Sequence, residues 1–165
     1  MRRPAISDAP VLIQLRTDPK VNQYLDRKPL SLEETETFIK KIDKSIRKRD
    51  SLYWIICLKD TADLIGTICL WNFNDEKNSA EIGYELMSAY HGKGLMAEAA
   101  SRVIALAFKK LKLDFLTAFT HPDNVPSARL LERYSFLRDL KNEYATPEEA
   151  DGLVVYFLRN ASDQN

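Results

Sequence analysis

The first part of the chain has the spacing of hydrophobic residues that is typical of helices. Val11, Leu12 and Leu15 fall on one helical face, and Asp8 before them is of a type that caps helix starts. Residues 1–6 leave room only for a very short first strand. The pattern therefore predicts that a helix, rather than a long strand, opens the fold.

A second and longer helix begins at a recognisable cap. Ser31 and Glu34 have the spacing of a capping box, in which each side chain accepts a hydrogen bond from the other residue's backbone N–H. The helix that follows carries one apolar stripe, formed by Phe38, Ile39, Ile42 and Ile46. Such a stripe predicts packing against one face of a larger structure.

The middle of the chain changes to strand patterns. Residues 52–58 and 64–73 are nearly continuous apolar runs separated by a polar turn, which predicts a buried antiparallel hairpin. Residues 80–87 alternate instead, so that Glu81 and Glu85 lie on one face of a third strand. Two carboxylates on one strand face require either solvent or a chemical role.

The last part of the chain alternates between helix and strand. Its predicted elements are a helix at 95–111, a strand at 114–120, a helix at 125–134 that Asn124 can cap, and strands at 136–140 and 153–158. The whole order predicts one α/β domain, with a mixed, mostly antiparallel sheet flanked by helices on both faces. We expect this domain to occupy residues 1–160 and the tail at 161–165 to be frayed.

Composition narrows the class of protein. The chain has 165 residues, with 24 basic and 24 acidic side chains, so it lacks the charge excess of a nucleic-acid-binding or membrane-surface protein. It shows no apolar leader segment, and we expect a cytoplasmic protein in which Cys57 and Cys69 are reduced core thiols. Cysteine and histidine do not cluster at metal-ligand spacing, so we expect no metal.

A glycine loop between the third strand and the next helix carries the main chemical signal. Gly92 and Gly94 allow a sharp turn, and the helix start behind them offers free N–H groups and partial positive charge to an anion. Lys93 adds a full positive charge, so a diphosphate is the expected ligand. The order of residues excludes a P-loop, and several strands precede the loop, which disfavours a dinucleotide fingerprint.

Two segments resemble the GNAT family, the GCN5-related N-acetyltransferases. His-Gly-Lys-Gly-Leu-Met at 91–96 resembles the diphosphate loop Q-G-K-G-[IL]-[MA] of the branch that acetylates the N-termini of ribosomal proteins. Asn-Val-Pro-Ser-Ala-Arg-Leu-Leu-Glu-Arg-Tyr-Ser-Phe at 124–136 resembles that branch's N-x-x-S-x-R-[LV]-L-E-K-x-G-F. The predicted order of elements is also similar to the GNAT order over nearly the whole chain.

The resemblance implies a function and a set of ligand contacts. It implies transfer of acetyl from acetyl-CoA, as co-substrate, to a primary amine, with the pantetheine arm pairing along the third strand where that strand splays from the next at a bulge. Asn124 then contacts the arm near the thioester. The other implied acetyl-CoA contacts are Met87 and Ser88 for the arm, and His91, Gly92, Lys93, Gly94, Leu95 and Met96 for the diphosphate.

The resemblance also suggests residues for proton transfer. Glu81 matches the base glutamate of histone-acetylating relatives, and Glu85 is the second carboxylate on that face, although either could form a salt bridge instead. Leu131 stands where the family often has a proton-donating tyrosine. Ser127 matches a serine proposed to act near the leaving thiolate, and it could equally be a helix cap.

The acceptor remains open at this stage. A protein N-terminal α-amine, a polyamine and an aminoglycoside are all compatible with the residues, as is an acyl-CoA-binding module without turnover. We expect the acceptor surface within residues 18–35 and 140–152. The protein would act as a monomer or a homodimer, without nucleic acid or membrane partners.

Overall fold

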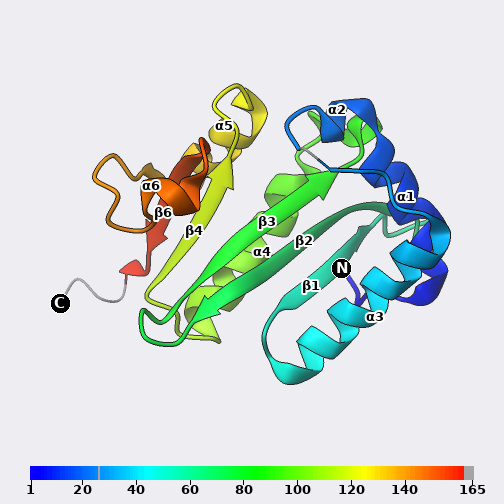
Figure 1. Ribbon diagram of the computed structural model, residues 1–165, viewed down its shortest axis with the longest axis horizontal. Coiled ribbons are helices and arrows are strands. Elements are labelled where there is room, and N and C mark those ends of the chain that lie inside the picture. Colours follow the sequence, from blue (N-terminus) through cyan, green and yellow to red (C-terminus); the bar gives the residue numbers. More distant parts are fainter. Residues whose placement is uncertain (26, 162–165) are drawn as a thin grey trace.

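A computed structural model of the chain describes residues 1–25 and 27–161 (Figure 1). Within these residues, six strands form one mixed sheet in the order β1-β2-β3-β4-β6-β5. The strands are β1 (Leu52–Cys57), β2 (Leu64–Asn74), β3 (Ser79–Leu86), β4 (Phe115–Thr120), β5 (Leu137–Arg138) and β6 (Val154–Arg159).

Strand directions follow from the connections. The β1–β2, β2–β3, β4–β6 and β5–β6 pairs are antiparallel, whereas β3 and β4 are parallel because a helix connects them. The sheet is therefore mixed and mostly antiparallel, and the predicted hairpin at β1–β2 is confirmed. The predicted single α/β domain with helices on both faces is also confirmed.

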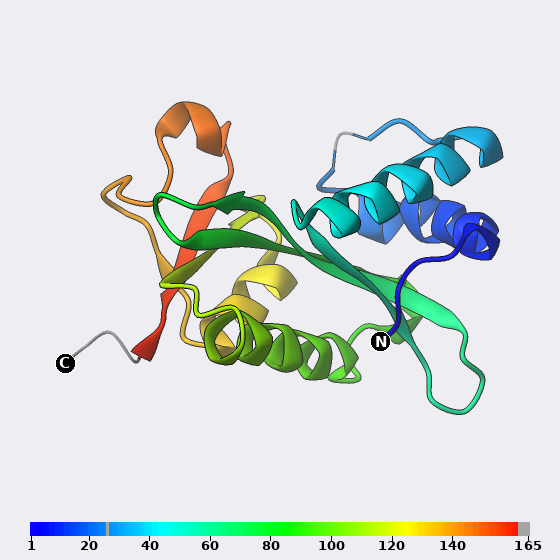
Figure 2. The ribbon, with the colours of Figure 1, turned by 90° about the horizontal axis from the view of Figure 1, so that it is seen from below.

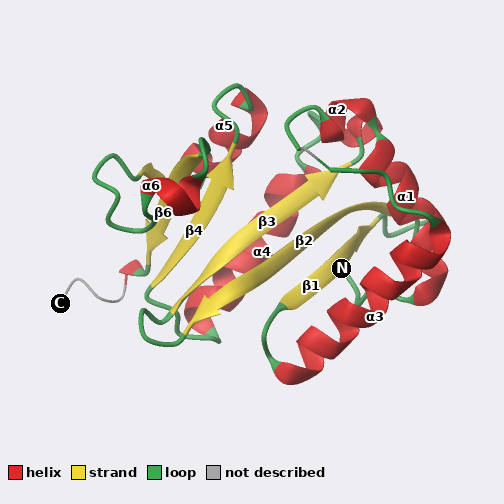
Figure 3. Cartoon of the chain, in the orientation of Figure 1, coloured by secondary structure: helices red, strands yellow, loops and turns green. Residues whose placement is uncertain are grey.

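Helices cover the two faces of the sheet unequally (Figure 2). One face carries α4 and α5, and the opposite face carries α1, α2 and α3 over β1 and β2, with α6 beside β6 (Figures 2 and 3). The helix bounds are α1 (Ala9–Thr17), α2 (Pro19–Asn22), α3 (Leu32–Lys48), α4 (Leu95–Lys109), α5 (Val125–Arg133) and α6 (Pro147–Ala150), with short 3-10 helices η1 (Ile6–Asp8) and η2 (Ser88–Tyr90).

Each face of the sheet has its own hydrophobic core. Beneath α4, the sheet contributes residues such as Ile68 and Leu116, which are fully buried. On the opposite face, Leu12 and Leu15 of α1 pack with Ile55 of β1. Burial on both faces explains why β1 and β2 are almost continuously apolar. No helix within the described part of the chain is long and apolar enough to cross a membrane.

Three local expectations change at the ends of the fold. The first strand is reduced to a single bridge between Arg2 and Ile55. Asp8 precedes α1 without capping it, because its carboxylate instead accepts hydrogen bonds from Arg2 and from the backbone N–H of Ala5. The strand predicted at 136–140 shortens to β5, because Asp139 turns the chain by accepting hydrogen bonds from the backbone N–H groups at 143–145.

The feature that positions the site is a split in the middle of the sheet. Within the described chain, β3 and β4 pair only from Ser79–Phe115 to Glu81–Thr117, and beyond these residues they diverge (Figure 1). The rest of β3 therefore has a strand partner on one side only, namely β2. We call the region between the diverging strands the β3–β4 split.

Candidate active site

Alternate residues of β3 direct their backbone N–H and C=O groups toward the split. Met87 donates its N–H to Ile65 of β2, so the odd-numbered residues of β3 direct their backbone groups toward β2. Tyr84 and Leu86 therefore direct theirs toward the split. This is the arrangement in which an extended ligand can add to a sheet as an extra strand.

Glu81 lies where the split begins. Burial raises the pKa of its carboxyl to about 7, although hydrogen bonds from the side chains of Asn72 and Trp71 act in the opposite direction. The carboxyl is therefore poised to exchange a proton near neutral pH. A group with this pKa, on the half-covered face of the sheet, is suited to general-base chemistry.

A β-bulge lies next to Glu81, but on a different strand from the one expected. Pairing of β2 with β3 is regular from Gly66–Leu86 to Trp71–Glu81, and the register then shifts between Trp71 and Asn74. Asn72 has a left-handed backbone there, with φ of 51°. The expectation of a bulge where β3 leaves β4 is corrected: the divergence is present, and the bulge belongs to β2.

Glu85 forms the salt bridge that was considered for it. Its two carboxylate oxygens accept hydrogen bonds from the guanidinium of Arg27, at 2.6 and 3.1 Å. The side chains are only 27% and 17% exposed for Arg27 and Glu85, so this fork-shaped pair is shielded from water. Arg27 ties the segment after α2 to β3, and Glu85 is not a free base.

The glycine loop has the backbone geometry that the sequence predicted. Gly92 and Gly94 both have φ of +74°, and the space where a side chain would begin is open at both positions. Gly94 is the N-cap of α4 and supplies no side-chain hydrogen bond to the helix start. An anion could therefore approach the first N–H groups of α4 closely.

The other loop residues divide into exposed and buried groups. Lys93 is exposed, with its ammonium 5.2 Å from the centre of the Tyr90 ring. Leu95 is half-buried and Met96 buried, so both anchor the helix start in the core. Nε2 of exposed His91 lies 2.7 Å from the carbonyl oxygen of Leu86. Since a carbonyl only accepts, this nitrogen carries a proton and joins the loop to the end of β3.

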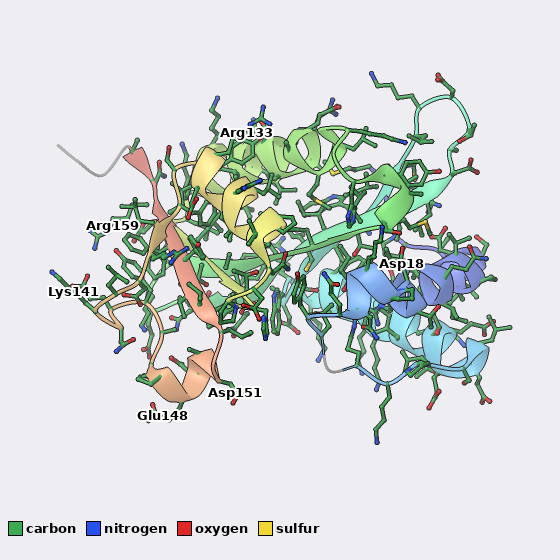
Figure 4. The ribbon with its side chains drawn as sticks, turned by 90° about the horizontal axis from the view of Figure 1, so that it is seen from above. Asp18, Arg133, Lys141, Glu148, Asp151 and Arg159 are labelled. Atoms are coloured by element: carbon green, nitrogen blue, oxygen red, sulfur yellow. The ribbon has the colours of Figure 1, made fainter. Side chains whose placement is uncertain are left out.

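Met87 and Ser88 are already engaged within the protein. The N–H of Met87 bonds to β2, and the N–H of Ser88 donates to a carboxylate oxygen of Asp18 at 2.9 Å. Their carbonyls accept hydrogen bonds from the N–H groups of Tyr90 and His91, respectively. Asp18, labelled in Figure 4, thereby fastens the junction of α1 and α2 to the start of the glycine loop.

A hydrogen bond joins β3 to α5, the helix that follows β4, on the α4 side of the sheet. Tyr84 of β3 and Ser127 of α5 are joined by a hydrogen bond of 2.9 Å between their hydroxyl oxygens. The Asn124 side chain caps α5, because its oxygen accepts from the N–H of Ser127 at 3.2 Å. Ser127 therefore gives its N–H to the cap that Asn124 makes, and its own hydroxyl bonds to Tyr84 instead of capping the helix. Burial raises the pKa of Tyr84 to about 12.

A second contact crosses between the arms. Tyr24, after α2, stacks on His121, which follows β4, with ring centres 5.4 Å apart. The backbone N–H of Asp123 donates to Nδ1 of His121 at 3.2 Å, which helps to hold the ring in place. Two contacts between segments distant in sequence therefore lie beside the β3–β4 split: Tyr84 with Ser127, and Tyr24 with His121.

Sequence reasoning missed several residues of this region. No sequence motif marks Tyr84, Trp71 or Arg27, because each contacts a partner that lies on another helix, strand or segment. A weak signal existed for Tyr84, whose alternation with Glu81 and Glu85 places it on the other face of β3. The described residues contain no group of three or more His, Cys, Asp or Glu side chains arranged to hold a metal ion.

The mixed sheet, the β3–β4 split and the glycine loop at the start of α4 are features of the acyltransferase class that the sequence resembles. The family model "Acetyltransferase (GNAT) domain" matches residues 1–136. The chain therefore belongs to the GNAT family and is, by family, an acetyl-CoA-dependent N-acetyltransferase.

Several known proteins are similar to the chain in sequence or in structure. It is 33% identical over 158 residues to p20, an uncharacterised N-acetyltransferase from Bacillus licheniformis, covering 94% of this chain and 86% of the relative. A candidate ribosomal-protein-serine acetyltransferase from Vibrio cholerae is similar in structure, with a TM-score of 0.81, 26% identity and coverage of 96% and 91%. RimJ of Mycobacterium smegmatis, determined with CoA-disulfide, shares the fold at a TM-score of 0.80, 17% identity and coverage of 99% and 83%.

Proposed function

We propose that this N-acetyltransferase acetylates α-amines, such as the N-terminus of a protein or peptide, with Glu81 as general base. The observation that carries the proposal is the half-buried Glu81 carboxyl at the start of the β3–β4 split, with a pKa of about 7. The similarity to the Vibrio cholerae protein supports the same kind of acceptor.

The cofactor would lie along the split. Its diphosphate would bind the N–H groups at the start of α4, next to Gly92, Lys93 and Gly94. Its pantetheine arm would pair with the free edge of β3, using backbone groups of Tyr84 and the N–H of Leu86, whose carbonyl oxygen is bonded to His91. Glu81 and Leu86 are five residues apart on the strand, about 17 Å of extended chain, so the arm would bring the thioester toward Glu81.

The ionisation of the acceptor favours an α-amine. An α-amine has a pKa of about 7.7–8.0, so its neutral form costs about 1–1.4 kcal/mol at pH 7. A lysine or polyamine amine, with a pKa of about 10.4, costs about 4.6 kcal/mol. A base with a pKa of about 7 is closely matched to the first amine and poorly matched to the second.

Glu85 gives no support to a polyamine acceptor. Its carboxylate is neutralised by Arg27, so it is not available to a polycation. The ionisation of the amine is therefore the ground for preferring an α-amine.

The proposed reaction is direct transfer. The neutral amine nitrogen attacks the thioester carbonyl carbon, Glu81 takes the amine proton directly or through a water, and the C–S bond breaks to release the CoA thiolate. A tyrosine with a pKa of about 12 is a weaker acid than a thiol, whose pKa is about 8.5. Tyr84 would therefore orient the Ser127 hydroxyl, which would stabilise the thiolate by a hydrogen bond, and solvent would supply the final proton.

The test uses paired peptides of one sequence that contains a lysine, one with a free α-amine and one with its N-terminus blocked. Thiol release from acetyl-CoA should be much faster with the free α-amine than with the blocked peptide or spermidine. Calorimetric titration with acetyl-CoA provides the separate binding measurement. Faster turnover of the blocked peptide would refute the α-amine assignment, and a protein that binds acetyl-CoA but acetylates none of these amines would indicate a binding module.

A further inference from the structure

The bulge in β2 changes which side chains reach Glu81. In a regular strand, Trp71 and Asn72 would point to opposite faces of the sheet. The register shift after Trp71 and the left-handed backbone of Asn72 break this alternation. Both side chains lie near enough to the Glu81 carboxyl to lower its pKa by hydrogen bonding, against the larger effect of burial.

The Trp71 ring reaches across to Gly83 of β3. A Cβ at position 83 would lie in ordinary contact with Nε1 of Trp71, at 3.7 Å, and more tightly against Sγ of Cys69, at 3.3 Å. Trp71 is directly opposite Glu81 in the β2–β3 register and remains 48% exposed. The indole therefore lies across β3 on the face of Glu81, and only part of it is covered by the protein.

We propose that Trp71 and Asn72 are positioning residues for Glu81, brought together on its carboxyl by the bulge in β2. Two donors from a neighbouring strand fix where the carboxyl oxygens point, so that an amine or a water can meet the free lone pairs. This inference rests on the proposed role of Glu81 as the base. It adds residues that neither touch the cofactor nor belong to the glycine loop.

The same contacts set the pH at which the base is active. Hydrogen bonds to a carboxylate favour its ionised form, so losing one donor should raise the apparent pKa of Glu81 by about one pH unit. Other titratable or charged groups on this face are Tyr53 of β1, Cys69 of β2, Arg16 of α1 and Glu85, which is held by Arg27. None of these is altered in the test.

The experiment compares Trp71→Phe and Asn72→Gly with the wild type. Phenylalanine keeps an aromatic ring but lacks the indole N–H, and glycine tolerates the positive φ of Asn72 while removing its amide. Asn142→Gly is the matched control, because Asn142 also has a positive φ, of 56°, and is exposed in the segment between β5 and α6. Melting temperature and acetyl-CoA binding establish that each variant is folded.

Two readouts follow the Glu81 carboxyl. The pH profile of kcat/KM for the α-amine peptide should move to higher pH in both variants, which lowers activity about five-fold at pH 7 and little at pH 9. Carbon-13 NMR of labelled glutamate side chains should show the same displacement for Glu81 without any turnover. The Asn142→Gly protein should match the wild type in both readouts.

The Glu81→Gln variant distinguishes a failure of the positioning role from a failure of the proposed function. If it is inactive and the two variants show unchanged pH profiles and NMR titrations, the positioning role is overturned while the proposed function stands. If Glu81→Gln is as active as the wild type, Glu81 is not the base and the inference falls with it. Displacement of both readouts, together with an inactive Glu81→Gln, supports the positioning role.

Discussion

Glu81→Gln should stabilise the protein at alkaline pH while it removes activity. The Glu81 pKa is about 7 in the folded protein, mainly because of burial, against 4.5 for an unperturbed glutamate. Between these two values the folded state binds more protons than the unfolded state, so the free energy of unfolding decreases as pH rises. Above pH 7 the folded protein carries the full cost of the buried charge.

The size of the effect follows from the same two values. At about 1.4 kcal/mol for each pH unit between them, the ionised carboxylate costs the folded state about 3.5 kcal/mol. This is an upper value, because Glu81 is only half-buried and water screens part of the charge. Glutamine has nearly the same shape and stays neutral, so the variant should avoid this cost.

Urea unfolding at about pH 4.5 and pH 8 provides the assay. The advantage of Glu81→Gln over the wild type should grow by about 2–3 kcal/mol between the two pH values. Glu98→Gln is the control, since Glu98 forms an exposed pair with Arg102 on α4 and its neutralisation should create no such advantage. An equal difference in stability at both pH values would show that the Glu81 pKa is not raised.

Three further predictions concern other parts of the molecule. Gly94→Ala should lose about 1 kcal/mol of stability and also weaken acetyl-CoA binding in calorimetry, whereas Gly152→Ala, at a similar φ of +78°, should lose stability alone. Asp8→Asn should lose about 2 kcal/mol in urea unfolding at pH 7. Although burial opposes ionisation, Arg2 holds the pKa of Asp8 below its usual value, so this loss should disappear as pH falls below the folded pKa. Ser127→Ala should lower kcat about ten-fold in the thiol-release assay, with little change in KM for acetyl-CoA.

Local patterns in the sequence were sufficient for most of the fold. The capping box of Ser31 and Glu34 forms as predicted at the start of α3, and its apolar stripe is the buried face of that helix. The alternation in β3 places Glu81 and Glu85 on one face. These features depend on residues within one or two turns or strand positions of each other, so the sequence carries them directly.

The glycine loop was also readable from the sequence alone. A position that needs a positive φ beside a helix start selects glycine, and Gly92 and Gly94 both adopt that conformation. The glycines of the motif therefore predict the positive φ angles that the loop adopts. The family that it suggested was confirmed over residues 1–136.

Tertiary structure decided how the two carboxylates of β3 differ. Glu85 meets Arg27 across 58 residues of sequence and becomes half of an ion pair, whereas Glu81 meets Trp71 and Asn72 at a bulge and has a raised pKa. No local pattern separates them, because each environment is created by another segment. Long-range packing sets burial and hydrogen-bond partners, and these in turn set the chemistry of an ionisable group.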